Sequence, residues 1–199
     1  MATSTNVTEG MVASYVVDAA RSRFQVRASA TGLLAAFGHN PTVAIRNFTG
    51  EAWYRPQAPE QSSLRVEIDP ASLAITGDVN EKDRQEMERA MREDVLETAH
   101  YPEIRFESTG IEAARIAEGM YRMKMSGKLT LHGVTRDLEF PCNVTAGDDS
   151  LRANGEFSIR QTDYGIKLVS VAGGTLKLKD ELKFTFDIAA HRRREAGNA

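Results

Sequence analysis

The sequence predicts an all-β protein of about eight antiparallel strands with one helix. Apolar and polar residues alternate along most of the chain, as they do in strands that bury one face. Short turns rich in Gly, Asp and Asn separate these stretches, which favours antiparallel neighbours. At 199 residues the chain is long enough for one domain with its own hydrophobic core.

Seven stretches carry the alternation clearly, and an eighth strand opens at Val43 and Ile45. The eighth changes parity near Asn47 and Phe48, as a β-bulge would make it do. Such strands can form a sandwich or close into a barrel, and closure has the advantage that it leaves no exposed edge. In chain order the seven are residues 23–30, 64–69, 104–109, 121–132, 138–144, 151–159 and 182–188.

One helix is predicted at about residues 80–98. Asn80 can cap its N-terminus, acidic residues follow in the first turn, and Pro102 prevents its continuation. We expect it to lie against a sheet or across one end of a barrel. At helical spacing it carries a narrow apolar stripe, Met87, Ala90, Met91 and Val95.

Composition excludes several classes of protein. Apolar residues make up 41% and charged residues 27%, as in a globular domain, and no apolar run is long enough for a transmembrane helix. A formal net charge of −3 argues against a nucleic-acid partner. The four His residues show no metal-ligand spacing, so we expect no metal and no cofactor. The single cysteine, Cys142, lies on the apolar parity of its strand, which predicts a buried, inert thiol.

The chain divides into a flexible N-terminal segment (1–13), a barrel domain (14–190) and a polar C-terminal tail (191–199). The first ten residues have neither a basic start nor an apolar core, so they are not a secretory signal. We therefore expect a cytoplasmic protein, or a periplasmic one if a leader has been removed.

The inward parity of the strands favours binding over catalysis. It mixes large Met and Phe residues with small ones such as Gly127 and Gly155, and it carries no carboxylate that could act as a general acid. Small residues on an inner face leave volume for a ligand. Alternatively, they lie where strands bend or where the helix packs closely.

Four segments resemble one known family, and they occur in the family's order. They are residues 48–50 (FTG), 101–108 (YPEIRFES), 127–135 (GKLTLHGVT) and the element Arg160-x-x-Asp163-Tyr164-Gly165-Ile166. Over about residues 14–190 the chain is similar to the YceI-like family. The resemblance implies a lipocalin-like, antiparallel eight-stranded barrel with a helical insertion. It also implies a long apolar cavity that holds polyisoprenoid or similar lipid chains, often in an exported protein, and no well-defined catalytic activity.

We therefore expect non-catalytic binding, storage or transport of an isoprenoid, such as an isoprenoid quinone, or of a fatty-acyl lipid. At the cavity mouth, His39 and Asn40 could donate hydrogen bonds to a phosphate or quinone oxygen. Arg160 could hold a diphosphate, or it could pair with Asp163. The predicted wall residues are Phe24, Ile45, Met123, Met125, Leu129, Leu131, Phe140, Phe157, Phe184 and Phe186.

Two other readings stay open. The chain could be an enzyme acting on a small apolar substrate in the same cavity, which would need titratable groups that point inward. It could also be a stress or interaction module whose barrel is fully packed. We expect no stable membrane insertion, and a homodimer that pairs through an outer face of the barrel is possible.

Overall fold

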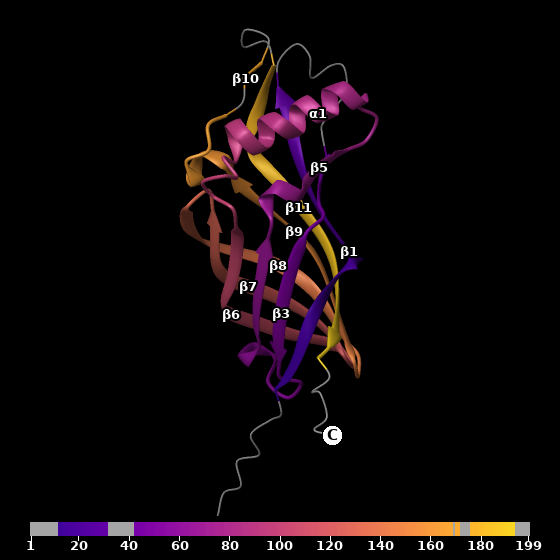
Figure 1. Ribbon diagram of the computed structural model, residues 1–199. Helices are drawn as coiled ribbons and strands as arrows, with labels where there is room; N and C mark the ends of the chain where they lie inside the picture. Colours follow the sequence, from indigo (N-terminus) through magenta and orange to yellow (C-terminus); the bar gives the residue numbers. More distant parts are fainter. Residues whose placement is uncertain (1–11, 32–41, 169, 172–175, 194–199) are drawn as a thin grey trace, which may run out of the picture.

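Eight antiparallel strands close into a barrel in the computed structural model, which describes residues 12–31, 42–168, 170–171 and 176–193 (Figure 1). The first barrel strand pairs with the last, so the hydrogen-bonded ring is complete. This closure confirms the barrel rather than the sandwich. The barrel strands are β1 (Ala13–Thr31), β3 (Phe48–Tyr54), β4 (Ser63–Ile68), β6 (Ile104–Ala117), β7 (Met120–Leu131), β8 (Val134–Ala146), β9 (Ser150–Arg160) and β11 (Leu176–Arg192).

Shorter elements are attached to this ring. The two-residue strand β10 (Ser170–Val171) pairs with β11. Strand β2 (Thr42–Ile45) lies between β1 and β5 (Leu73–Thr76), and β5 ends the sheet. In the described part of the chain, 3₁₀ turns connect strands at η2 (Pro59–Gln61), η3 (Pro70–Ser72) and η5 (Gln161–Tyr164).

The prediction of a β-bulge near Asn47 is wrong, because the chain passes there from one strand, β2, to the next, β3. β2 pairs with Gln25–Arg27 of β1, whereas β3 pairs with Ala13–Val16 of the same strand and with β4. Ile45 and Phe48 are both buried on either side of the break, which is the parity change seen in the sequence. The Asn47 backbone N–H donates to Ser72 Oγ at 3.0 Å and holds the break in place.

The helix lies across one end of the barrel, as predicted (Figure 1). It runs as α1 (Glu81–Ala90) and continues as a π-helical turn, η4 (Met91–Val95). The Asn80 side chain accepts a hydrogen bond from the Asp83 backbone N–H, which confirms the predicted cap. Glu88 Oε1 accepts a hydrogen bond from the Ile75 backbone N–H at 2.8 Å. A helix side chain thereby satisfies part of the free edge of β5.

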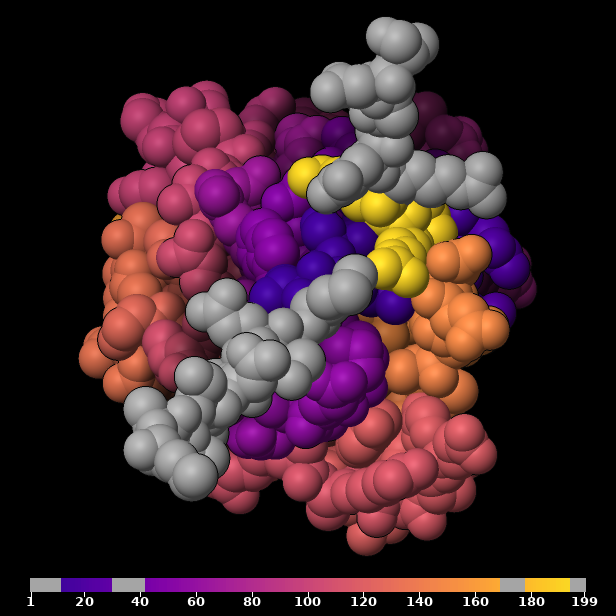
Figure 2. Space-filling model, turned by 90° about the horizontal axis from the view of Figure 1, so that it is seen from below, coloured from indigo at the N-terminus to yellow at the C-terminus, as the bar shows by residue number. Residues whose placement is uncertain are grey.

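Side chains of the first and last barrel strands pack together at the end away from α1. There the rings of Tyr15 and Tyr54 meet edge to face, with centroids 6.4 Å apart, beside Ala13 and Ala190. In the space-filling view of this end, indigo, purple and yellow atoms of β1, β3 and β11 gather near the centre, and orange and pink atoms of other strands lie to the sides and below (Figure 2). Aromatic packing therefore narrows the barrel at this end.

At two inward glycines, the ring of a phenylalanine on a neighbouring strand occupies the space beside the glycine. A Cβ at Gly155 would lie 2.8 Å from the Phe186 ring and 2.7 Å from the Pro141 carbonyl oxygen. A Cβ at Gly127 would overlap the ring of Phe106. The expectation that these small residues leave volume is wrong at both positions, because a ring from the neighbouring strand takes up the space beside each glycine.

Replacing Gly127 by alanine should lower the free energy of unfolding by about 1–3 kcal/mol, because the added methyl group collides with the Phe106 ring and the Glu107 carbonyl oxygen. Urea denaturation at equilibrium measures the change. Gly110→Ala is the matched control, since nothing lies within 4 Å of a Cβ at that strand position. Equal stabilities of the two variants would contradict this packing.

Candidate functional site

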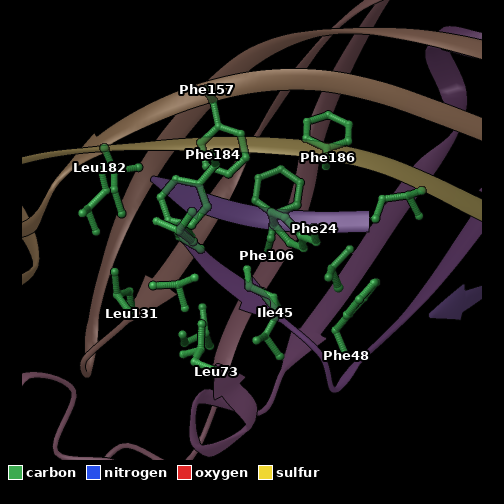
Figure 3. A pocket seen from close by; sticks show the side chains of 18 of the residues that line it. Phe24, Ile45, Phe48, Leu73, Phe106, Leu131, Phe157, Leu182, Phe184 and Phe186 are labelled. Carbon is green, nitrogen blue, oxygen red and sulfur yellow. The ribbon is translucent and has the colours of Figure 1, made fainter. Parts of the chain in front are cut away.

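The barrel encloses a cavity of about 1290 Å³. This exceeds the range of roughly 300–1,000 Å³ typical of small-molecule sites, and it equals the volume of about 40 liquid waters. Side chains from strands on opposite sides of the barrel point into it (Figure 3). The cavity extends from Trp53 and Tyr54 near the narrowed end to residues of α1 and η4 at the other. An interior of this size excludes a fully packed barrel.

Phenylalanine rings form one continuous surface on the wall. Phe157 of β9 and Phe184 of β11 are cross-strand partners, and their rings stack with centroids 4.7 Å apart at an interplanar angle of 3°. The Phe140 ring lies 5.1 Å from that of Phe157 and meets Phe186 edge to face at 5.7 Å. Phe24 of β1 contacts both Phe184 and Phe186, so the surface crosses the closure of the barrel. Rings held by one another keep the wall open instead of collapsing across the axis.

All ten side chains predicted for the wall line the cavity. They come from six strands, because the inward positions of each strand alternate with outward ones. These residues are Phe24, Ile45, Met123, Met125, Leu129, Leu131, Phe140, Phe157, Phe184 and Phe186.

None of the three residues predicted for the cavity mouth is found among the described residues that line the cavity. Arg160 does not line the cavity: it follows inward Ile159, so it points out of the barrel. There it borders a small outer depression with Arg136 and Asp163, and the Arg136 side chain donates to the Asp163 carbonyl oxygen. Placing Arg160 at the mouth was therefore wrong. His39 and Asn40 lie outside the described residues.

Several wall residues were missed. Val66 and the helix stripe showed apolar periodicity, which was the signal that could have added them. Leu73 and Ile75 of β5 gave no such signal, because three consecutive residues of this short strand are buried. The cavity residues outside the predicted set include Phe48, Leu64, Val66, Ile68, Leu73, Ile75, Met87, Met91, Val95, Leu96 and Phe106.

His132 ties the helical insertion to the barrel from outside the cavity. Its Nε2 lies 2.8 Å from Glu97 Oε2, and its Nδ1 lies 3.3 Å from the Tyr164 carbonyl oxygen. The ring of Tyr101 packs on the imidazole with centroids 4.2 Å apart. The turn after β7, the segment after η4 and η5 are thus joined at one histidine.

Titratable groups are nearly absent from the deep wall. Burial raises the pKa of the Cys142 thiol to about 11, so the thiol is neutral and unreactive at neutral pH. The charged residues that line the cavity within the described ranges all belong to the segment 78–94 at the helix end. Among the described residues no three His, Cys, Asp or Glu side chains are placed to hold a metal ion. The described part of the deep wall thus offers mainly apolar contact.

Known proteins with similar sequences share nearly the whole chain. A UPF0312 protein of Pseudomonas savastanoi pv. phaseolicola is 29% identical over 176 residues, which cover 85% of each chain. A UPF0312 protein of Azotobacter vinelandii is 30% identical over 175 residues, which cover 86% of this chain and 77% of the relative.

Two solved structures share the fold. One is BcnA of Burkholderia cenocepacia, with a TM-score of 0.65 and 19% identity over 87% of this chain and 98% of that one. The other is a polyisoprenoid binding domain from Saccharophagus degradans implicated in plant cell wall breakdown, with a TM-score of 0.67 and 17% identity over 92% of this chain and all of that one.

No helix within the described part of the chain is both long and apolar enough to cross a membrane. The sequence model of a protein family, the YceI-like domain, matches residues 15–190, which is almost the same span as the barrel. The family match and the similar relatives agree with the closed barrel and the helix across its end. The chain therefore belongs to the YceI-like family.

Proposed function

We propose that this protein binds a long-chain apolar lipid, of isoprenoid or acyl type, in the barrel cavity and acts as its carrier or store. The observation that carries the proposal is the 1290 Å³ cavity walled by Phe, Met, Leu, Ile and Val side chains. The polyisoprenoid binding domain of Saccharophagus degradans, which shares the fold, supports an isoprenoid as the first ligand to test.

The wall provides what a hydrocarbon chain needs. Such a chain makes no directional contacts, and its binding comes from removing apolar area from water at roughly 25 cal/mol per Å². Burial of about 300 Å² of chain would contribute roughly 7 kcal/mol before association costs are subtracted. Flexible Met123 and Met125 beside the rigid rings allow the wall to adapt to chains of different shape.

We propose that binding is not followed by a chemical step. A reaction on the buried chain would need a nucleophile or a general base along the deep wall. Cys142, which lines that wall, is held as a neutral thiol by its raised pKa.

Protein purified from cells should carry an organic-extractable adduct of a few hundred daltons, detected by native mass spectrometry. Met125→Trp should reduce its occupancy at least about fivefold, because the indole fills part of the cavity that the Met125 side chain lines. Lys124→Trp is the matched control: it adds the same side chain at the neighbouring, outward position and should leave occupancy unchanged. Equal occupancy in the two variants, each with a native-like circular dichroism spectrum, would place the ligand elsewhere.

Alkylation of the single cysteine should report whether the cavity is occupied. With a pKa of about 11, only about one thousandth of Cys142 is thiolate at pH 8, and this fraction rises about tenfold for each pH unit up to pH 10. N-ethylmaleimide should therefore modify the delipidated protein slowly, about tenfold faster at pH 9 than at pH 8. Loading with geranylgeraniol should slow it further, because the lipid covers the wall around Cys142. Rates that do not change on loading would count against a ligand at this wall, and Cys142→Ser checks that only this residue reacts.

A further inference from the structure

Charge on the cavity wall is confined to one end and is mostly negative. Among the described residues that line the cavity, the charged ones are four carboxylates and one guanidinium, all from the segment that leads into α1 and η4. We refer to the four carboxylates as the acidic rim: Asp78, Asp83, Glu86 and Asp94.

The one basic residue of this wall is already engaged. Arg89 Nη1 donates to Glu93 Oε2 at 2.9 Å, and this contact with Glu93 raises the pKa of the guanidinium. Asp78, Glu86 and Asp94 of the acidic rim make no hydrogen bond or salt bridge with a described residue, although the charges of Asp94 and Glu86 also raise the pKa of Arg89. Four carboxylates against one guanidinium, which is itself paired with Glu93, still leave the rim negative. The rim therefore presents a net negative potential to whatever emerges from the cavity.

Among the described residues, the rest of the wall holds no compensating cation. Near the narrowed end the polar lining consists of neutral groups of Trp53, Tyr54, Ser62 and Ser63. The buried Gln161 side-chain amide donates a hydrogen bond to the Lys179 carbonyl oxygen at 3.0 Å. The internal segments outside the described residues, 32–41, 169 and 172–175, contain no Asp, Glu, Lys or Arg in the sequence, and His39 is their one titratable side chain.

From this distribution we infer that the cavity selects lipids by head-group charge: it accepts long chains with a neutral or cationic head and discriminates against phosphorylated or carboxylated ones. The inference rests on the proposed lipid-binding function. A phosphate head at the rim would meet carboxylates where it needs Arg or Lys. At the other end it would find hydroxyl and indole groups, which do not neutralise a charge. An alcohol, quinone, amide or amine avoids both costs.

Three C20 isoprenoids with the same tail test the selection: geranylgeraniol, geranylgeranylamine and geranylgeranyl phosphate. Binding to delipidated protein is followed by native mass spectrometry and by fluorescence of Trp53, the single tryptophan, which lines the cavity. In 20 mM salt we expect the phosphate to bind at least about tenfold more weakly than the alcohol, and the amine at least as tightly as the alcohol. In 0.5 M salt the gap should narrow, because screening shortens the reach of the rim charges below about 10 Å.

A charge-neutralised variant isolates the rim. In Asp78→Asn/Glu86→Gln/Asp94→Asn the phosphate should bind within about threefold of the alcohol, because the side chains keep their size and break no hydrogen bond or salt bridge with a described residue, while Arg89 stays paired with Glu93. The matched control, Asp137→Asn/Glu139→Gln/Glu156→Gln, changes net charge by the same amount on the outside of the barrel, and it should retain the tenfold gap.

The outcomes separate the two ideas. Phosphate binding as tight as alcohol binding in the unmodified protein, or a gap that the rim variant leaves unchanged, overturns the head-group inference while lipid binding stands. If none of the three C20 compounds binds, the proposed function fails and the inference fails with it. A gap lost equally in the rim variant and in the control also overturns it, since net charge alone would then be the cause.

Discussion

The pairing of β1 with β11 is the constraint on which the cavity depends. It joins the two ends of the domain, with Phe24 opposite Phe186 and Val26 opposite Phe184, and it completes the hydrogen-bonded ring. Once the ring is closed, the eight-stranded wall is held by backbone hydrogen bonds rather than by side chains that meet at the axis. The interior can then remain partly vacant without loss of the fold. An open sandwich would have to fill the same space to hold its two sheets together.

Within the closed wall, glycines and phenylalanines act as pairs. Phe186 lies over Gly155 directly across the strand pair, and Phe106 lies over Gly127 on the adjacent strands. Each ring thereby takes up the space that the missing side chain leaves on the inner face and contributes apolar surface to the cavity. Along the same wall, the rings of Phe140, Phe157 and Phe184 pack on one another.

Which elements could be predicted from the sequence depends on whether their residues carry a periodic pattern. The long strands were predictable because a strand with one buried face has period two, and the helix because Asn80 caps it and its apolar stripe recurs at helical spacing. β5 escaped prediction because its three consecutive buried residues carry no period. Arg160 was misplaced although its parity relative to Ile159 already marked it as outward. The cavity volume could not be predicted at all, since the space left by a glycine depends on which residue the register places beside it.

The barrel strands supply the apolar wall of the cavity, and the helical insertion supplies the charged residues at its end. A strand of this barrel cannot direct a carboxylate inward without burying it among aromatic rings, at a large desolvation cost. The helix lies across the barrel end, so Asp83 and Asp94 can border the cavity while their charges stay hydrated. The insertion is fastened at separate points, by Glu88 on β5 and by the Glu97–His132 contact, and neither belongs to the acidic rim. Under the proposed head-group selection, substitutions on the cavity-facing side of the helix should therefore change which head group is accepted, while the barrel wall stays the same.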